Sequence, residues 1–189
     1  MYSDIKIAET INKFMIDVDD IARIREAGKL INSEMDDHID TFYMWLKNHK
    51  EYGIFFGNNP KRLSRVMEMQ KIHWLSFFEA KLDQKWFSSR IHIGDVHAHI
   101  NLPNDIYFAG MSVSGKSLVD RILKIKPAIK DAEEMASSII KLVFLDSFVV
   151  IEEISRIQRE KLSAGTQALI EMSTPVTPIW DGILLLPLL

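Results

Sequence analysis

Histidines and carboxylates are the metal-ligating side chains in this sequence, because it contains no cysteine. The lack of cysteine excludes disulfides, thiolate metal sites, iron–sulfur clusters and thiol catalysis. The six histidines are His38, His49, His73, His92, His97 and His99. No two of them have the His-x-x-x-His spacing that places two imidazoles on one helical face. A metal cage built by the protein alone is therefore not expected. One histidine suffices where a porphyrin supplies the equatorial ligands, and a structural role is the alternative for each of them.

A second pattern satisfies the phosphate-binding consensus G-x-x-x-x-G-K-[ST], with Gly110, Gly115, Lys116 and Ser117 at its fixed positions. Residues 142–146 likewise resemble the strand that ends in the magnesium-linked aspartate of NTPases. Such a loop binds phosphates only between a buried parallel strand and a helix. The residues before Gly110 are too few and too polar for a central strand. A P-loop NTPase is therefore the disfavoured alternative, and we expect a helix with both glycines at a close packing face.

Long runs without glycine or proline point to helices. Neither residue occurs in the 33 positions from 61 to 93 or in the 37 positions from 128 to 164. Strands need more frequent turns than this. We expect helices at about residues 4–15, 18–31, 34–49, 60–79, 84–99, 103–125 and 129–161, with a short turn at 52–56. The sequence therefore predicts an all-α fold class for most of the chain.

The end of the chain changes character. Prolines at 175, 178 and 187 exclude a long helix there, and Asp181-Gly182 is a turn signal. We expect short strands at 179–180 and 183–186. A lone hairpin is only marginally stable in water, so these strands are expected to begin a second, α/β domain that is truncated here.

Composition and charge narrow the possible partners. The chain has 189 residues, of which 47% are hydrophobic and 26% charged, as in a globular protein. The net charge of -3 provides no electrostatic footprint for nucleic acid or anionic lipid. The first 20 residues lack the apolar core of a signal peptide, and no run of about 18 uncharged apolar residues occurs. We expect a soluble, cytoplasmic protein that binds neither nucleic acid nor membrane.

Residues 90–107, RIHIGDVHAHINLPNDIY, resemble the proximal signature of globin-coupled sensors, roughly R-x-x-I-G-x-x-H-x-x-I-G-L-x-P/P-x-W-Y. Phe42-Tyr43 and Gln70-x-x-His73-Trp74 are similar to the distal B-helix and E-helix landmarks of that family, and the order and spacing agree over residues 15–160. This sequence departs from the family pattern by having Asn101, Ile106 and Met111 in place of glycine, tryptophan and an aromatic residue.

The resemblance implies a sensor-globin fold of about seven helices around a haem b pocket in residues 1–161. It identifies His97 as the iron ligand through Nε2, with the other ring nitrogen donating to a backbone carbonyl one turn back, near Ile93. His99 is the first alternative ligand. The other pocket residues that the resemblance implies are Phe42, Tyr43, Val66, Met69, Ile93, Ile100 and Tyr107. Tyr43 is the expected hydrogen-bond donor to a gas ligand, with plain packing as its alternative, and Val66 and Met69 are expected to keep water out.

Residues 173–189, STPVTPIWDGILLLPLL, are similar to the start of the STAS domain in RsbR-type stressosome proteins. With residues 162–172 as a linker, this resemblance implies a haem-based sensor of O2, or of NO or CO, that regulates a stressosome output. The implied partners are STAS-domain stressosome proteins and a cognate kinase. The sequence shows no catalytic dyad, so no enzymatic activity is expected. The alternative is a globin-like dimeric scaffold that binds no haem.

The last two helices are expected to form a homodimer, because in this family they make a four-helix interface. Apolar residues occupy more than one face of the last helix: Ile139, Ile140, Leu142, Val143, Phe144, Leu145, Phe148, Val149, Val150 and Ile151. Such a pattern fits a helix buried both by its own domain and by a partner. The central helix of a monomer would have the same pattern.

Overall fold

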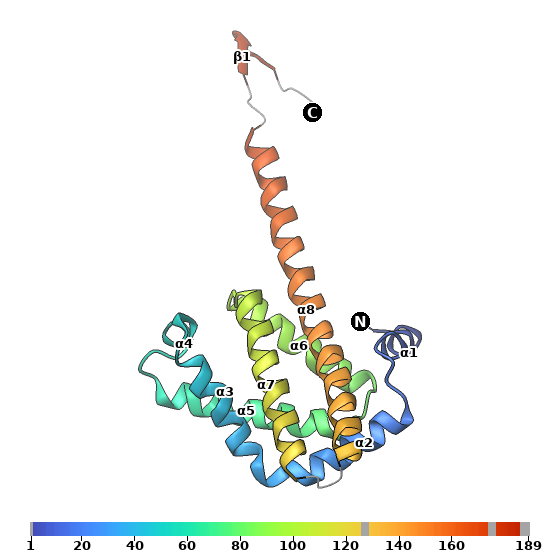
Figure 1. Ribbon diagram of the computed structural model, residues 1–189. Helices are drawn as coiled ribbons and strands as arrows, with labels where there is room; N and C mark the ends of the chain where they lie inside the picture. The colour runs from blue at the N-terminus through green and yellow to red at the C-terminus, as the bar shows by residue number, and fades with distance from the viewer. Residues whose placement is uncertain (1, 126–128, 174–176, 186–189) are drawn as a thin grey trace.

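The computed structural model describes residues 2–125, 129–173 and 177–185, and consists of a helical body from which one long helix projects (Figure 1). Its helices are α1 (Asp4–Lys13), α2 (Val18–Ile31), the 3-10 turn η1 (Asn32–Glu34), α3 (Met35–Leu46), α4 (Lys50–Phe55), α5 (Pro60–Glu79), α6 (Gln84–His99), α7 (Asn104–Ile125) and α8 (Ile129–Ser173). The all-α fold class of the body is confirmed.

Local capping explains several of these boundaries. Asp17 and Asp20 form a reciprocal capping box at the start of α2. Asn59 Oδ1 accepts a hydrogen bond from Arg62 N at 3.0 Å, and Pro60 occupies the first position of α5. Asp83 caps α6 in the same way, with its Oδ1 3.0 Å from Trp86 N.

Several helix boundaries differ from the expectation. The helix expected at 34–49 follows the 3-10 turn η1 and ends at Leu46. The first helix ends at Lys13 instead of residue 15, because Met15 adopts a left-handed conformation with φ 52°. Residues 50–55 form α4, where only a turn at 52–56 was expected. The last helix continues to Ser173 instead of ending at 161, since residues 162–172 contain good helix formers and no proline. A single glycine, Gly165, does not interrupt it.

The core forms around the lower half of α8. This helix packs against α6, α7 and α2, and α3 packs against α7 and α5. Ile139, Leu142 and Leu145 of α8 are completely buried. The body therefore surrounds one end of α8, whereas the side chains of residues 158–170 are exposed on the projecting stalk.

The stalk leads to two short strands, β1 (Thr177–Trp180) and β2 (Ile183–Leu185), which pair antiparallel. Gly182, in the turn between them, has φ 78°, a conformation that glycine adopts without steric cost. Residues 174–176 and 186–189 of the STAS-like segment, including the last residue of the expected second strand, lie outside the described residues.

The P-loop-like segment is helical, as expected. Residues 110–117 lie within α7, and Asp146 lies within α8. A Cβ at Gly110 would lie 2.9 Å from a ring carbon of Phe42, so this glycine allows α3 to approach α7 closely. Lys116 forms an exposed ion pair with Asp120 one turn along α7. No loop is present here to hold phosphate.

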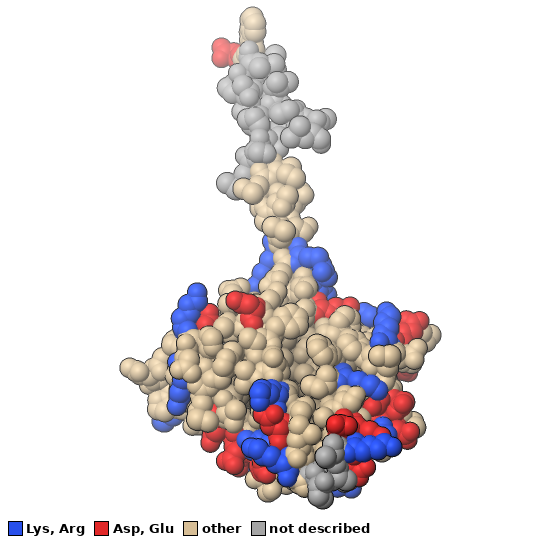
Figure 2. All heavy atoms as spheres, in the orientation of Figure 1, with Lys and Arg blue, Asp and Glu red and all other residues tan. Residues whose placement is uncertain are grey.

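Acidic and basic side chains are interspersed over the visible face of the body, without a field of one sign (Figure 2). Within residues 2–125 and 129–173, no helix has both the length and the apolarity that crossing a bilayer requires.

Candidate functional site

His97 lies near the C-terminal end of α6, with its Nδ1 2.7 Å from the backbone oxygen of Ile93. A carbonyl can only accept, so Nδ1 carries the hydrogen and Nε2 keeps its lone pair. Burial lowers the pKa of His97, and the hydrogen bond to Ile93 opposes this shift only in part. The expected hydrogen bond is present, and it leaves a neutral imidazole with Nε2 available as a ligand.

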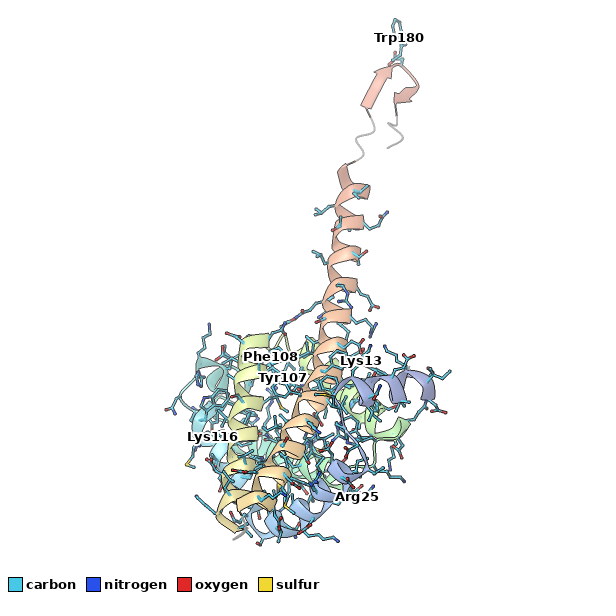
Figure 3. All side chains as sticks on the ribbon, turned by 45° about the vertical axis from the view of Figure 1, so that its right-hand side comes forward. Lys13, Arg25, Tyr107, Phe108, Lys116 and Trp180 are labelled. Carbon is cyan, nitrogen blue, oxygen red and sulfur yellow. The ribbon has the colours of Figure 1, made fainter. Side chains whose placement is uncertain are left out.

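Tyr107 of α7 fixes the other side of this imidazole. The two rings meet edge to face, with their centroids 5.6 Å apart and an interplanar angle of 74°. Figure 3 shows Tyr107 and Phe108 together near the upper end of α7. Burial raises the pKa of the Tyr107 hydroxyl, as does the nearby Asp146, while a hydrogen bond with Ser147 opposes the shift. Tyr107 is therefore a neutral, fixed wall of the site.

His99, the alternative ligand, is placed differently. Its Nδ1 lies 2.8 Å from the backbone oxygen of Asp95, and its side chain is 65% exposed. Asp95 also presents a carboxylate oxygen 3.3 Å from the same nitrogen. The imidazole that is held against other helices is that of His97.

Gly94 sets the position of α6 on α8. A Cβ at this position would lie 2.6 Å from the backbone oxygen of Val150, so only glycine allows the two helices to meet here. After the helix, Asn101 has φ 52°, a conformation that asparagine tolerates better than most residues. The replacement of the family's glycine by Asn101 is thus compatible with the same backbone turn.

The α5 helix presents apolar side chains that no part of the described chain covers. Val66 and Met69 are 38% and 59% exposed. They precede His73 by seven and four residues, and therefore share its face of α5. His73 Nε2 lies 3.6 Å from a carboxylate oxygen of Asp146 on α8. Because His73 points towards α8, the same face of α5 directs Val66 and Met69 to the side of the molecule where α6 and α8 lie.

A matching apolar face lies on α6. Ile93 and Ile100 flank His97 at helical spacing, with Ile93 half-buried and Ile100 partly exposed. Val96, next to His97, is also exposed. Ile93 packs partly against the core, so the exposed apolar side chains of the two helices are Val66, Met69, Val96 and Ile100.

Tyr43 and Phe42 of α3 form a separate group. Tyr43 is buried, and its ring contacts Phe42 at 5.2 Å and Phe56 at 5.9 Å between centroids. Burial raises the pKa of the Tyr43 hydroxyl, and Tyr52 adds to the shift, so the hydroxyl stays protonated and able to donate. A cavity of about 460 Å³ beside Tyr43 is lined by residues of α3, α5 and α7. None of its lining residues comes from α6, so this cavity does not join Tyr43 to His97.

The structure contains a buried polar cluster that the sequence analysis did not predict. Arg90 Nε donates to Asp146 Oδ2 at 2.8 Å, and both side chains are essentially inaccessible. Arg90 also lies over the ring of Trp86, 4.0 Å from its centroid. Asp146 is the single charged residue in the apolar run LVFLDSFVV. A lone carboxylate in such a run needs a buried partner, and that signal could have revealed the cluster.

These residues fit a haem. The neutral His97 offers one strong axial ligand, while α5 and α6 offer uncovered apolar side chains to a flat apolar macrocycle. Gln70 Oε1 and His73 Nδ1 are buried without a hydrogen-bond partner among the described residues, so polar groups also remain available on the α5 side. In the part of the chain that the structure describes, no three histidines or carboxylates gather to bind a metal ion. A single-histidine ligand is consistent with that finding.

Comparisons with known proteins agree with the fold. Residues 4–160 match the protein family described as Protoglobin. The heme-based aerotactic transducer HemAT of Halobacterium salinarum is 24% identical over 128 residues, which are 68% of this chain and 26% of that protein. The chain therefore spans about a quarter of the length of this relative. The globin domain of the Geobacter sulfurreducens globin-coupled sensor superposes with a TM-score of 0.72 at 15% identity, covering 77% of this chain and 95% of that domain.

Proposed function

Because the chain belongs to the protoglobin family, we propose that residues 1–161 form a domain that binds haem b and senses a gas. The observation that carries this proposal is His97, whose ring is held by Ile93 and Tyr107 and whose Nε2 remains available. The similar transducer from Halobacterium salinarum is named as heme-based, which supports the same cofactor here. Val66 and Met69 on one helix and Ile93 and Ile100 on the other would hold the macrocycle; Phe42 and Tyr43 would lie on the distal side.

Haem iron supplies a coordination position for O2, NO or CO. The protein would determine which gas binds most tightly, and Tyr43 is the best candidate for the residue that does so. Its protonated hydroxyl is a hydrogen-bond donor, and a polar ligand such as O2 gains more from a donor than CO does. Val66 and Met69 cannot donate. We therefore favour O2 as the ligand, with NO as the alternative.

We further propose a homodimer in which two α8 helices associate in parallel. A seam of exposed and half-buried side chains on α8 follows the four-and-three spacing of a coiled coil. It consists of Phe144, Phe148, Ile151, Ser155, Gln158, Leu162, Gly165 and Leu169. Phe144, Leu162 and Leu169 are more than 60% exposed in the single chain. The seam begins in the globin body and continues along the stalk, which suits a helix that carries a signal out of the domain.

The proposed output is a STAS domain of a cytoplasmic stressosome complex, with a cognate kinase, and no enzymatic activity is assigned to the chain. The support for this part is the resemblance of residues 173–189 to the start of such a domain. The unbroken course of α8 from the core to Ser173 also supports it, since a continuous helix couples a sensor to whatever follows it.

Absorbance of the purified protein near 400 nm tests haem binding. Wild type is expected to bind haem stoichiometrically, and His97→Ala to lose it while keeping its helical circular dichroism. His99→Ala, in which an exposed imidazole is removed, is the matched control and should keep the spectrum. Full haem retention in His97→Ala would refute the ligand assignment. A wild type that binds no haem would favour the haem-free scaffold instead.

Light scattering at micromolar concentration tests the dimer. Charge at the seam should give monomers, so Phe148→Glu and Ile151→Glu are informative. Leu162→Glu is the cleaner variant, because Leu162 lies on the stalk, 73% exposed in the single chain. Ile54→Glu is the control, since Ile54 is similarly exposed on α4, away from the seam. A monomeric wild type would contradict the proposal.

A further inference from the structure

The buried carboxylate of Asp146 lies against α6, which carries His97, and against α5. Arg90 of α6 donates to Asp146 Oδ2 at 2.8 Å, and His73 Nε2 of α5 lies 3.6 Å from Asp146 Oδ1. Arg90 Nη1 additionally donates to Ser76 Oγ of α5 at 3.0 Å. We propose that Asp146 is a positioning residue that fixes the separation of α5 and α6, and through it the geometry at His97. The proposal rests on the proposed haem-binding function.

On the α6 side, the ion pair begins a line of close contacts that leads to His97. Arg90 meets Asp146, and Gly94, one turn later, meets the backbone of Val150, which is one turn after Asp146. At the end of α6, Lys161 Nζ donates to the backbone oxygen of Ala98 at 3.3 Å. The two helices therefore run alongside each other in register. A displacement of Arg90 would move α6, and His97 lies about two turns, or 10.5 Å, further along the same helix.

On the α5 side, Arg90, which Asp146 holds, restrains the helix through its hydrogen bond to Ser76 at the end of the apolar face. Met69 and Val66 lie one and two turns before His73 on that face. Their side chains are exposed, so they contribute little to holding α5 in place. The contacts of His73 and Ser76 with the cluster restrain α5 on this face, while Leu63 and Met67 pack against the core on another face.

The chemistry of the cluster suits a positioning role. Replacing a buried ion pair with apolar residues is often neutral or stabilising, so the pair is weak grounds for stability, whereas its geometry is specific. The bond from Arg90 is short, and the guanidinium is stacked on Trp86, which leaves the carboxylate little freedom. The charged and titratable groups that face Asp146 are Arg90, His73 and Tyr107. They come from α6, α5 and α7, so one side chain of α8 contacts or faces all three helices.

The chain has no cysteine, so pairs of spin labels can be introduced without removing native residues. Labels at Glu68→Cys on α5 and His92→Cys on α6, both exposed, report the separation of the two helices. In Asp146→Asn we expect the distance distribution to shift or broaden by about 1–2 Å, the size of a helix displacement. The measurement is made without haem and repeated with it.

Asp20→Asn is the matched control. Asp20 is also a buried carboxylate that pairs with α8, through Lys141 at 2.8 Å, but it lies on α2 and does not touch α5 or α6. Its replacement should lower the melting temperature without changing the label distance. In the haem-loaded protein, Asp146→Asn should also shift the iron–His97 stretching frequency, and Asp20→Asn should not.

Equal label distances in wild type and Asp146→Asn would overturn the proposal, whatever the loss of stability. If Asp146→Asn does not fold, Ser76→Ala serves instead, because it removes the bond between Arg90 and α5 without leaving a buried charge unpaired. It should give a smaller displacement in the same direction, and no displacement would refute the proposal. A wild type that binds no haem defeats the proposed function, whereas the label distances in haem-free protein decide the positioning role.

Discussion

The α6 helix, which carries His97, and the α5 helix pack against the rest of the domain in different ways. The α6 helix packs along its length on α8, with Arg90, Gly94 and Ala98 buried at successive turns. The fully buried residues of α5, Trp74, Phe77 and Phe78, all lie in its second half. In its first half, the side chains at Val66 and Met69 are exposed.

This difference gives α6 and the first half of α5 different roles. Contacts within the chain, with Ile93 and Tyr107, orient His97 on α6. In the first half of α5, Leu63 and Met67 pack against the core, whereas Val66 and Met69 present an exposed apolar face that another surface can cover. We therefore expect changes on α6 to affect folding, and changes in the first half of α5 to affect haem and its ligands.

The largest effect is expected at the α6–α8 contact. In Gly94→Ala, the new methyl group would lie 2.6 Å from the backbone oxygen of Val150 and 2.8 Å from Glu153 Cβ. Because the backbone of α8 cannot move away without disturbing the helix, the free energy of unfolding should fall by about 3 kcal/mol or more. Chemical denaturation of haem-free protein measures this. Gly53→Ala in α4 is the control, since its methyl would meet nothing within 4 Å and should stabilise by about 0.5–1 kcal/mol. An unchanged Gly94→Ala would show that α6 does not depend on this contact.

His38 of α3, which packs against the second half of α5, should make the free energy of unfolding depend on pH. This buried imidazole contacts Trp74 edge to face at 5.0 Å, and its Nδ1 lies 3.0 Å from Ser117 Oγ. Burial, assisted by the charge of Arg121, lowers the pKa of His38 from 6.5 to about 4. As the pH falls below 6.5, the unfolded chain binds the proton first, so the contribution is lost between pH 6.5 and 4 and amounts to about 3 kcal/mol at most.

Urea unfolding of wild type and His38→Gln between pH 7 and 4 isolates this contribution. His73 and His97 have lowered pKa values too, so both proteins should lose stability on acidification, and the variant should lose less. Parallel pH profiles would show that His38 does not titrate on unfolding.

Much of the fold followed from the sequence, and the reasons are specific. The breaker-free runs predicted α5, most of α6 and the first part of α8, because helix formation there is local. The continuation of α8 past residue 161 was missed, since Gly165 ends the breaker-free run and residues 162–172 were expected to be a linker. His97 and its bond to Ile93 followed from helical spacing and the resemblance. The cluster around Asp146 could not be located, because Arg90 of α6 and His73 of α5 lie 56 residues or more from Asp146 in sequence.

Tyr43→Phe tests the distal side with an intermediate effect. In the proposed function the protonated, buried hydroxyl donates to the bound gas, so its removal should take a hydrogen bond from the gas-bound state and little from the free state. O2 dissociation should accelerate about ten- to hundredfold, equivalent to about 1.4–2.8 kcal/mol, while CO dissociation changes far less. Stopped-flow displacement measures both rates. Equal O2 dissociation rates would mean that Tyr43 only packs against Phe42 and Phe56, and would favour NO as the ligand.

Met69→Gln is expected to have the smallest effect on folding. It also tests most directly the difference between α6 and the first half of α5. Met69 is 59% exposed, so exchanging it for a polar side chain of similar length should change the stability of haem-free protein by less than about 0.5 kcal/mol. If this side chain covers haem, the same exchange places an amide against an apolar surface, and haem transfer to a scavenger apoprotein should become faster. Glu68→Gln, on the neighbouring exposed face of α5, should change neither quantity. A stability loss as large as that of Gly94→Ala would show that the first half of α5 is held by the protein itself, which would remove the distinction between the two helices.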